Sequence, residues 1–156
     1  MATTRADGQR LLLLPCCLMV FALAACTRGY PEEDAPRVSP FDMSNDERLA
    51  ALNELARQAH PERKWSYSLE GNCELSVEYR RKGNRATHTT SKLVRAMDAD
   101  LAFDKQDGTY DVVLRASSHR DAEAIATVME SKEWTDASQA SLYLTLLIRD
   151  CDRPSS

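Results

Sequence analysis

Residues 65–80 read WSYSLEGNCELSVEYR, and this stretch decides the fold of the chain. Apolar and polar side chains alternate on each side of the central EGN, over 65–69 and again over 73–80. Alternation with a period of two is typical of a strand that buries one face. A Gly-containing turn between two such runs predicts an antiparallel hairpin.

Further strands are predicted downstream of this hairpin. The turn KGN at 82–84 leads into 86–90, whose polar, Thr-rich composition indicates an edge strand. The runs 100–105 and 110–116 flank the sequence QDGT, and Asp-Gly between apolar runs is a strong hairpin signal. We therefore expect four or five antiparallel strands in one sheet.

Helices are predicted on both sides of the strands. Ser44 followed by Glu47 is a capping box, and apolar residues then recur at helical spacing until Pro61. A second helix is predicted from Ser117 or Ser118, and a third from Thr135. The apolar positions that define the three helices are Leu49, Leu52, Leu55, Ala56 and Ala59; Ala122, Ile125, Ala126 and Met129; and Ala137, Ala140, Leu144, Leu147, Ile148 and Cys151.

The last of these helices has an alternative. Residues 143–148 are nearly all apolar and also fit a buried strand, so 136–150 is either helix or partly strand. The apolar spacing that continues back to Ala137 favours the helix. The expected fold class is α+β, with an N-terminal helix, an antiparallel sheet of four to five strands, and two C-terminal helices packed on one face.

Composition limits the class of protein. The chain has 156 residues, of which 43% are hydrophobic, and this amounts to one domain rather than a disordered chain. Lys and Arg number 20 and Asp and Glu 24, for a net charge of −4. A nucleic-acid partner is not expected, because neutralising phosphates requires a positive surface.

The first 25 residues have the character of a secretory leader. A weakly basic start precedes the uncharged apolar run 11–25, which is shorter than the ~20 residues that a helix needs to cross a bilayer core. The run ends in LAAC at 23–26, which resembles the lipobox of bacterial lipoproteins, and the resemblance covers residues 1–27. It implies cleavage before Cys26 and a lipid thioether on that residue.

The same resemblance implies a location. Thr27, rather than Asp, follows the lipidated cysteine, which by the sorting rule of enteric bacteria favours the outer membrane, facing the periplasm. Residues 26–43 are then the lipidated cysteine and a flexible tether rich in Pro and acidic side chains, and 44–152 are a single globular domain.

Two cysteines remain once Cys26 is lipidated. Because the compartment beyond the inner membrane is oxidising, we predict a disulfide between Cys73 and Cys151. The alternative is a pair of free, buried thiols. A redox site is not expected, since the chain has no C-x-x-C motif.

One segment departs from the acidic average. No Asp or Glu occurs from Tyr79 to Met97. The cations in this candidate binding patch are Arg80, Arg81, Lys82, Arg85, Lys92 and Arg95. Such a patch can attract anionic lipid headgroups, lipopolysaccharide phosphates or an acidic partner protein. The alternative is charge that keeps an edge strand from pairing with another chain.

Histidine spacing predicts no metal site. His60, His88 and His119 do not have the spacing of a zinc motif, and neither do the cysteines. His60 is expected at the C-terminus of a helix, where an imidazolium would complement the helix dipole. Ser117 to Asp121 places Ser, His and Asp side by side, but a catalytic triad must converge through space, and helix capping explains these residues better.

The acidic residues are the remaining candidates for chemistry. Asp98, Asp100, Asp104 and Asp107 do not fit the ligand spacing of an EF-hand, which leaves a weak calcium site or a solvated turn. The sequence predicts a membrane-anchored lipoprotein of the cell envelope that acts as a non-enzymatic binding or accessory module without a cofactor. Its candidate partners are the membrane, through the anchor, and an envelope protein, anionic lipid or lipopolysaccharide. The alternatives are a small envelope hydrolase using Asp98, Asp100 or Asp104 with a His, and a purely structural lipoprotein.

Overall fold

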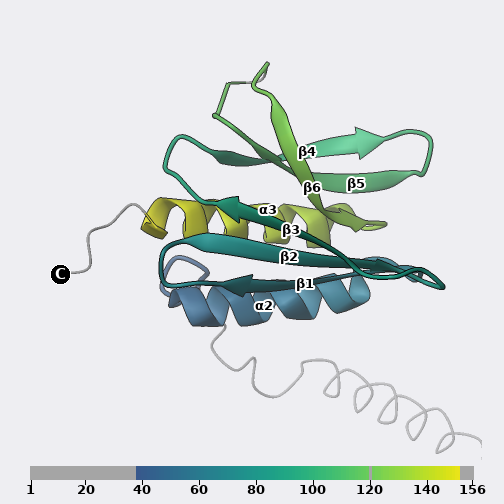
Figure 1. The fold of residues 1–156 in the computed structure, drawn as a ribbon, viewed down its shortest axis with the longest axis horizontal. Coiled ribbons are helices and arrows are strands. Elements are labelled where there is room, and N and C mark those ends of the chain that lie inside the picture. Colours follow the sequence, from purple (N-terminus) through teal and green to yellow (C-terminus); the bar gives the residue numbers. More distant parts are fainter. Residues whose placement is uncertain (1–37, 120, 152–156) are drawn as a thin grey trace, which may run out of the picture. The chain divides into compact units, whose positions relative to one another are not determined.

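The computed structural model describes residues 38–119 and 121–151. Figure 1 shows the described helices and strands. Their bounds are α2 Asn45–Gln58, β1 Arg63–Leu69, β2 Glu74–Arg81, β3 Thr87–Lys92, β4 Asp98–Asp104, β5 Thr109–Arg115, β6 Ala124–Ser131 and α3 Trp134–Cys151. Among these residues, no helix has both the length and the apolar character that crossing a membrane requires.

The strands form two antiparallel three-stranded sheets, so the predicted single sheet of four to five strands is wrong. The strand order is β1-β2-β3 in the first sheet and β4-β5-β6 in the second. The connection between β3 and β4 buries Leu93 and Met97 in the core. Because this connection turns inward, β4 leaves the edge of β3 and starts a new sheet. The α+β class itself is confirmed.

Residues 124–131 form strand β6, and not the helix predicted after Ser117 or Ser118. Opposite β5, the register of β6 shifts twice, which makes Ile125 and Val128 the extra residues of two bulges. The second bulge buries Val128 and Met129 in succession. A bulged strand loses its period of two, and the apolar residues of this one therefore had helical spacing. The described chain has one C-terminal helix rather than two.

Helix α2 begins at the predicted capping box, which is confirmed. The Ser44 hydroxyl accepts the N–H of Glu47 at 3.3 Å, and the Glu47 carboxylate accepts the N–H of Ser44 at 2.7 Å. This helix is not at the N-terminus of the chain, since residues 1–37 precede it and lie outside the described residues. The last helix, α3, is continuous through 143–148, so the strand alternative for that segment is wrong. Thr135 lies within its first turn rather than before it.

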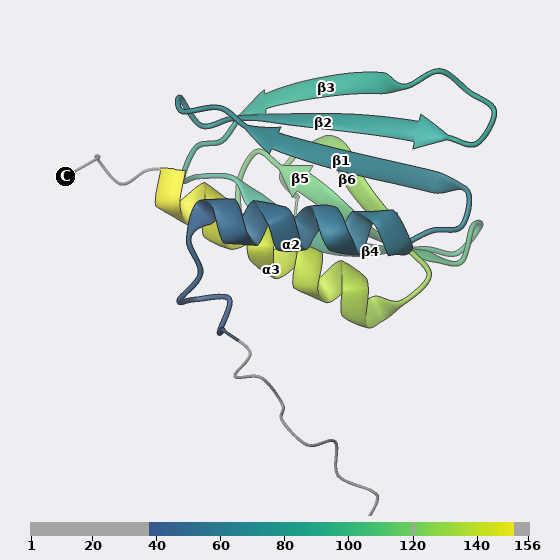
Figure 2. The ribbon, with the colours of Figure 1, turned by 90° about the horizontal axis from the view of Figure 1, so that it is seen from below.

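One hydrophobic cluster joins both sheets and both helices. Helix α3 packs against all three strands of the second sheet, whereas α2 packs against β1 and against α3. Figure 2 shows the two helices side by side. The fully buried residues that link these elements include Leu52 and Ala56 of α2, Leu75 of β2, Val112 and Leu114 of β5, and Leu144 and Leu147 of α3. Helix α3 therefore covers the second sheet, whereas α2 lies along β1 at one edge of the first sheet.

Candidate binding surface

The β2–β3 hairpin carries most of the basic residues singled out in the sequence. Its strands pair from Glu74 with Lys92 to Tyr79 with Thr87, and the connecting turn has Gly83 at φ +84°. A positive φ favours glycine, which has no Cβ, and this explains the residue at that position. The turn projects the hairpin beyond the rest of the first sheet (Figure 1).

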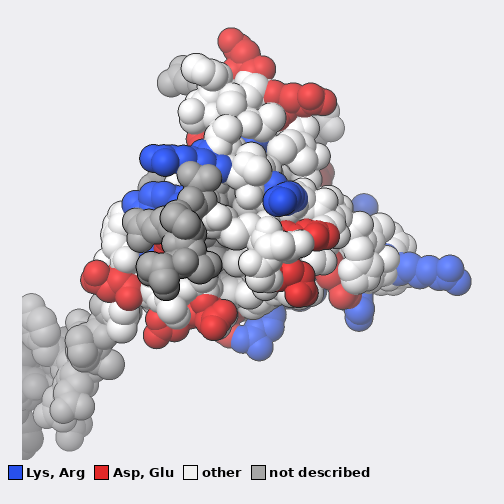
Figure 3. All heavy atoms as spheres, turned by 60° about the vertical axis from the view of Figure 1, so that its left-hand side comes forward, with Lys and Arg blue, Asp and Glu red and all other residues white. Residues whose placement is uncertain are grey.

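The structure divides the basic residues into two groups. Arg80, Arg81, Lys82 and Arg85 are exposed at the hairpin turn, and we call them the tip cations. Lys92 lies opposite Glu74, at the far end of the same strand pair, and Arg95 follows it in the next connection. Five residue steps from Thr87 to Lys92 correspond to roughly 17 Å along a strand. In Figure 3, one set of Lys and Arg side chains lies at the protruding end of the molecule. Another set lies on the side that faces the viewer, at a distance from the first.

Strand pairing adds two cations that the sequence analysis missed. Arg63 lies opposite Arg81, and Lys64 lies opposite Arg80. The period-two pattern of 65–69 could have revealed them. If the predicted strand is extended by two residues toward the N-terminus, both side chains lie beside the β2–β3 hairpin. Arg63 is occupied by ion pairs with Asp107 and Glu130. No described carboxylate lies within ion-pair distance of Lys82 or Arg85.

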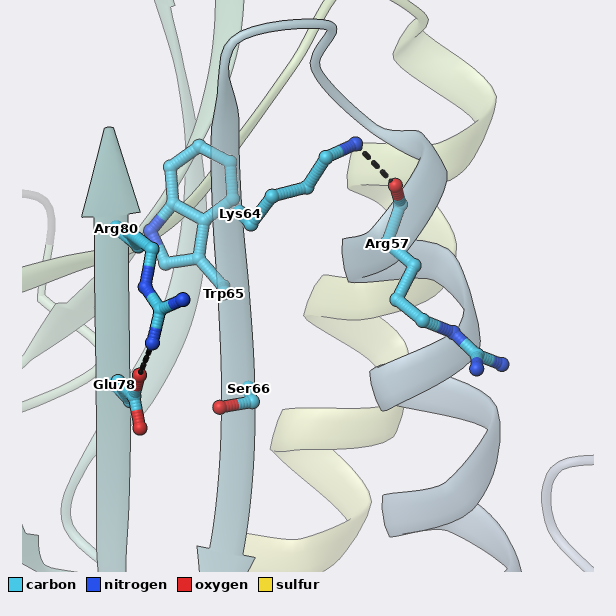
Figure 4. A pocket seen from close by; sticks show the side chains of 6 residues that line it. All are labelled: Arg57, Lys64, Trp65, Ser66, Glu78 and Arg80. Atoms are coloured by element: carbon cyan, nitrogen blue, oxygen red, sulfur yellow. Dashed lines mark hydrogen bonds and ion pairs between the residues drawn. The ribbon is translucent and has the colours of Figure 1, made fainter. Parts of the chain in front are cut away.

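A hollow of about 300 Å³ lies between α2 and the outer face of the first sheet (Figure 4). Its cations already have partners: Lys64 donates to the carbonyl oxygens of Arg57 and His60, and Arg80 donates to Glu78 at 3.1 Å. Lys64 thereby satisfies one carbonyl in the last turn of α2 and one just beyond the helix, and it holds that helix against β1. The hollow is a structural seam, and the tip cations other than Arg80, which are Arg81, Lys82 and Arg85, are better placed to receive an anion.

His60 does not act as the predicted imidazolium. It is 6% exposed, and its Nδ1 accepts the N–H of Glu62 at 3.1 Å. Burial lowers its pKa, with the charges of Arg63 and Lys132 acting in the same direction. The helix end is complemented by the ammonium of Lys64 instead.

The remaining candidate residues do not converge. Ser117 and His119 lie in the β5–β6 connection, where the Ser117 hydroxyl accepts the N–H of His119. That bond replaces the predicted helix cap. His88 is exposed on β3, with Nε2 4.0 Å from a carboxylate oxygen of Glu78.

The predicted acidic residues make separate local contacts. Asp98 accepts the N–H of Ala99, Asp104 accepts that of Gln106, and Asp100 pairs with Arg115 at 3.2 Å. Asp107 pairs with Arg63. Within the described chain, no three His, Cys, Asp or Glu residues gather as a metal site would require.

The structure places the sulfur atoms of Cys73 and Cys151 at disulfide distance, with their Cα atoms 5.6 Å apart. Cys73 has φ +64° and ends the turn between β1 and β2. Glycine usually occupies this position of a three-residue hairpin loop. A cysteine there makes the cross-link possible, but its left-handed backbone conformation is energetically unfavourable for an L-residue. Cys26 lies outside the described residues.

Comparison with known proteins adds no relative. The chain matches no protein family, no curated protein and no solved structure.

Proposed function

We propose that this chain is a lipid-anchored, non-enzymatic accessory module of the bacterial cell envelope that binds an acidic partner protein through its tip cations. The leader and the LAAC sequence at 23–26 support the anchor and the outer-membrane location. The position of the cations in the fold supports the partner, and this is the observation that carries the proposal.

The described chain starts at the end of the domain that lies opposite the tip cations. Arg48, which is 2% exposed, donates to the carbonyl oxygens of Pro40 and Phe41 and pairs with Asp150. These contacts hold residues 38–43 of the expected tether beside the end of α3. In Figures 1 and 2 this end and the β2–β3 turn are on opposite sides of the domain.

This arrangement favours a protein over the anchoring bilayer. Strand β2 runs from the residue after Cys73 to the tip, which is roughly 25 Å for its length. A domain that is attached through residues 38–43 presents its tip cations away from the attachment point, toward other envelope components. Exposed cations attract an acidic surface through long-range Coulomb forces and increase its rate of association. Anionic lipid or lipopolysaccharide of a facing membrane would use the same cations and is an outcome of the test.

Site-specific cross-linking tests the proposal in cells. A photo-reactive residue replaces Asn84 in the full chain, expressed with its own leader, and captured species are compared with and without Lys82→Glu. We expect defined protein adducts that weaken in the single variant and disappear in Arg81→Glu/Lys82→Glu/Arg85→Glu. Lys105→Glu is the matched control, because it makes the same charge change in the exposed β4–β5 turn.

Three results would contradict parts of the proposal. If the adducts persist in the triple variant, the tip cations do not bind the partner. Binding to vesicles that contain anionic phospholipid, lost in the triple variant and without protein adducts, would replace the protein partner with a membrane. If a Cys26→Ser chain still fractionates with membranes, a lipid on Cys26 is not what anchors the protein.

A further inference from the structure

The two outer edges of the first sheet differ in how their backbone groups are satisfied. On β1, the N–H of Tyr67 donates to the Asn53 side-chain oxygen at 2.8 Å, and the Asn53 amide donates to the Tyr67 carbonyl at 3.0 Å. Asn53 lies on α2, so this helix closes the β1 edge with a bond in each direction. No other strand can pair at that position.

The β3 edge has no such cover. The N–H of Leu93 donates to the Cys73 carbonyl at 2.8 Å, which fixes the alternation of the ladder. In an antiparallel pair, every second residue then points its N–H and C=O toward the neighbouring strand. On β3 those are Thr87, Thr89 and Ser91, so His88, Thr90 and Lys92 point theirs away from β2.

No described strand lies on that side of β3. It is the terminal strand of its sheet, and β2 is the only described element with which it packs extensively. Figure 2 shows it at the rim of the sheet, on the side away from α2. An edge of this kind is a template for an added strand, whose main-chain hydrogen bonds supply affinity.

Charge selects the chemistry of that strand. Lys92 and His88 point to the outer face of the sheet, where Glu74 and Glu78 of β2 lie opposite them, and the exposed Lys82 and Arg85 stand at one end of the edge. The edge strand itself and the turn before it carry no acidic residue, so the excess charge at the edge is positive at the turn. A second copy of β3 in antiparallel register would bring its own cations against these, so self-pairing is disfavoured while an acidic strand is attracted.

The inner face beside β3 offers room for alternate side chains. A hollow of about 320 Å³ lies there, lined by Trp65, Tyr79, Thr87, Thr89 and three residues of β6. The ring centroids of Trp65 and Tyr79 are 5.3 Å apart. A strand added to β3 would direct every second side chain into this hollow and the others toward Lys92 and His88.

We propose that the outer edge of β3 binds an extended acidic segment of a partner protein as a fourth strand of the first sheet. The segment has acidic residues on the outer face and small β-branched residues toward the hollow. This inference rests on the proposed function, since it names how the partner of the tip cations is held.

The test uses a synthetic peptide, Glu-Val-Glu-Val-Glu-Val-Glu, and the detergent-solubilised full chain. A second peptide has the same sequence with N-methyl groups on the residues whose N–H would face β3, which preserves charge and removes ladder bonds. We expect N-methylation to weaken binding on the order of ten-fold or more in fluorescence anisotropy, because several hydrogen bonds of ordinary strength are lost. Amide exchange should slow at His88, Thr90 and Lys92 on binding of the unmodified peptide.

A protein variant provides the matching change on β3. Thr90→Pro blocks the outward N–H without removing a bond to β2, since proline is tolerated on an edge whose N–H faces solvent. Thr90→Pro should weaken binding of the unmodified peptide as much as N-methylation of the peptide does, whereas Thr90→Val should leave binding unchanged. If the variant fails to fold, the two peptides still decide the question on the unaltered chain.

The outcomes separate the two proposals. Equal binding of both peptides would overturn the added strand and leave an electrostatic partner site intact. Absence of binding by either peptide would overturn the inference, and the cross-linking experiment would then judge the tip cations alone. Peptide-independent dimers, detected by sedimentation and abolished by Thr90→Pro, would assign the edge to a second copy of the chain.

Discussion

Both sheets have three antiparallel strands, but they differ in which strands they bury. The central strand β5 of the second sheet buries Val112, Val113 and Leu114, and α3 covers all three strands. On β4, at one edge of this sheet, the Ser141 hydroxyl donates to the Ala99 carbonyl at 2.7 Å. In the first sheet, β3 buries none of its residues and leaves its edge open. Both sheets contribute to the core, but only the first has a strand outside it, and this strand belongs to the hairpin at its far end.

The largest effect should come from breaking the link between the sheets. The Cys73–Cys151 pair joins the first turn of the first sheet to the helix that covers the second. On the chain-entropy account, a closed loop of about 79 residues contributes roughly 4 to 5 kcal/mol. Cys73→Ser/Cys151→Ala should lower the free energy of unfolding by an amount of that order, measured by urea denaturation without reductant.

A matched variant isolates the backbone at Cys73. Cys73→Gly/Cys151→Ala also lacks the cross-link but places glycine at φ +64°. It should be more stable than the Ser variant by about 1 kcal/mol, because a left-handed conformation costs an L-residue roughly that much. Equal stability of the two would show that the turn relaxes when the bond is absent.

The next largest effect should distinguish the buried central strand of the second sheet from the exposed edge strand β3. Leu114 is fully buried, so Leu114→Ala should cost about 2 to 5 kcal/mol through lost burial and the cavity that remains. Thr89→Ala on exposed β3 should change stability by no more than about 0.5 kcal/mol. Urea unfolding monitored by circular dichroism measures both. A similar cost for the two would mean that β3 also supports the core.

Sequence reasoning succeeded where side chains obey a simple period and failed where they do not. The alternation over 65–80 predicted the β1–β2 hairpin, and the capping box predicted the start of α2. The bulges of β6 broke the period of two and produced a false helix. The division into two sheets depends on which way 93–97 turns, and local pattern carries no such information.

The binding surface was predictable in the same uneven way. The run without acidic residues marked the hairpin, and the polar composition of 86–90 marked an edge strand. The closed edge of β1 was hidden, because Asn53 is one polar residue on the packed side of a helix. Only the structure shows that its amide meets Tyr67, 14 residues away in the sequence.

A smaller loss should follow from opening the β1 edge. Asn53→Ala leaves the N–H and C=O of Tyr67 without their partners in a half-buried position, which costs about 1 to 3 kcal/mol. Gln58→Ala on the exposed side of α2 is the control and should be nearly neutral. Amide exchange at Tyr67 should become faster in the first variant only. Unchanged protection there would mean that the helix shields this edge without the amide.

The smallest effect concerns the ion pairs between the sheets. Arg63 of β1 bonds to Asp107, in the turn between β4 and β5, and this contact lowers the pKa of the Asp107 carboxyl below its ordinary value of 3.8. The unfolded chain therefore takes up this proton at a higher pH than the folded chain does. The corresponding stability is present above the ordinary pKa and is lost as the pH falls through the folded one.

Asp107→Asn should consequently lose less stability than the unaltered chain between pH 5 and about 2.5, by urea unfolding at each pH. Asp111 works in the opposite direction, because burial raises its pKa, and it remains in both proteins. Asp121→Asn, in the exposed β5–β6 connection, controls for the change of one charge. Identical acid profiles for Asp107→Asn and the unaltered chain would show that Arg63 binds the second sheet through Glu130 alone. The ion-pair contact between the two sheets would then depend on β6, which contacts β1, rather than on the turn of the β4–β5 hairpin.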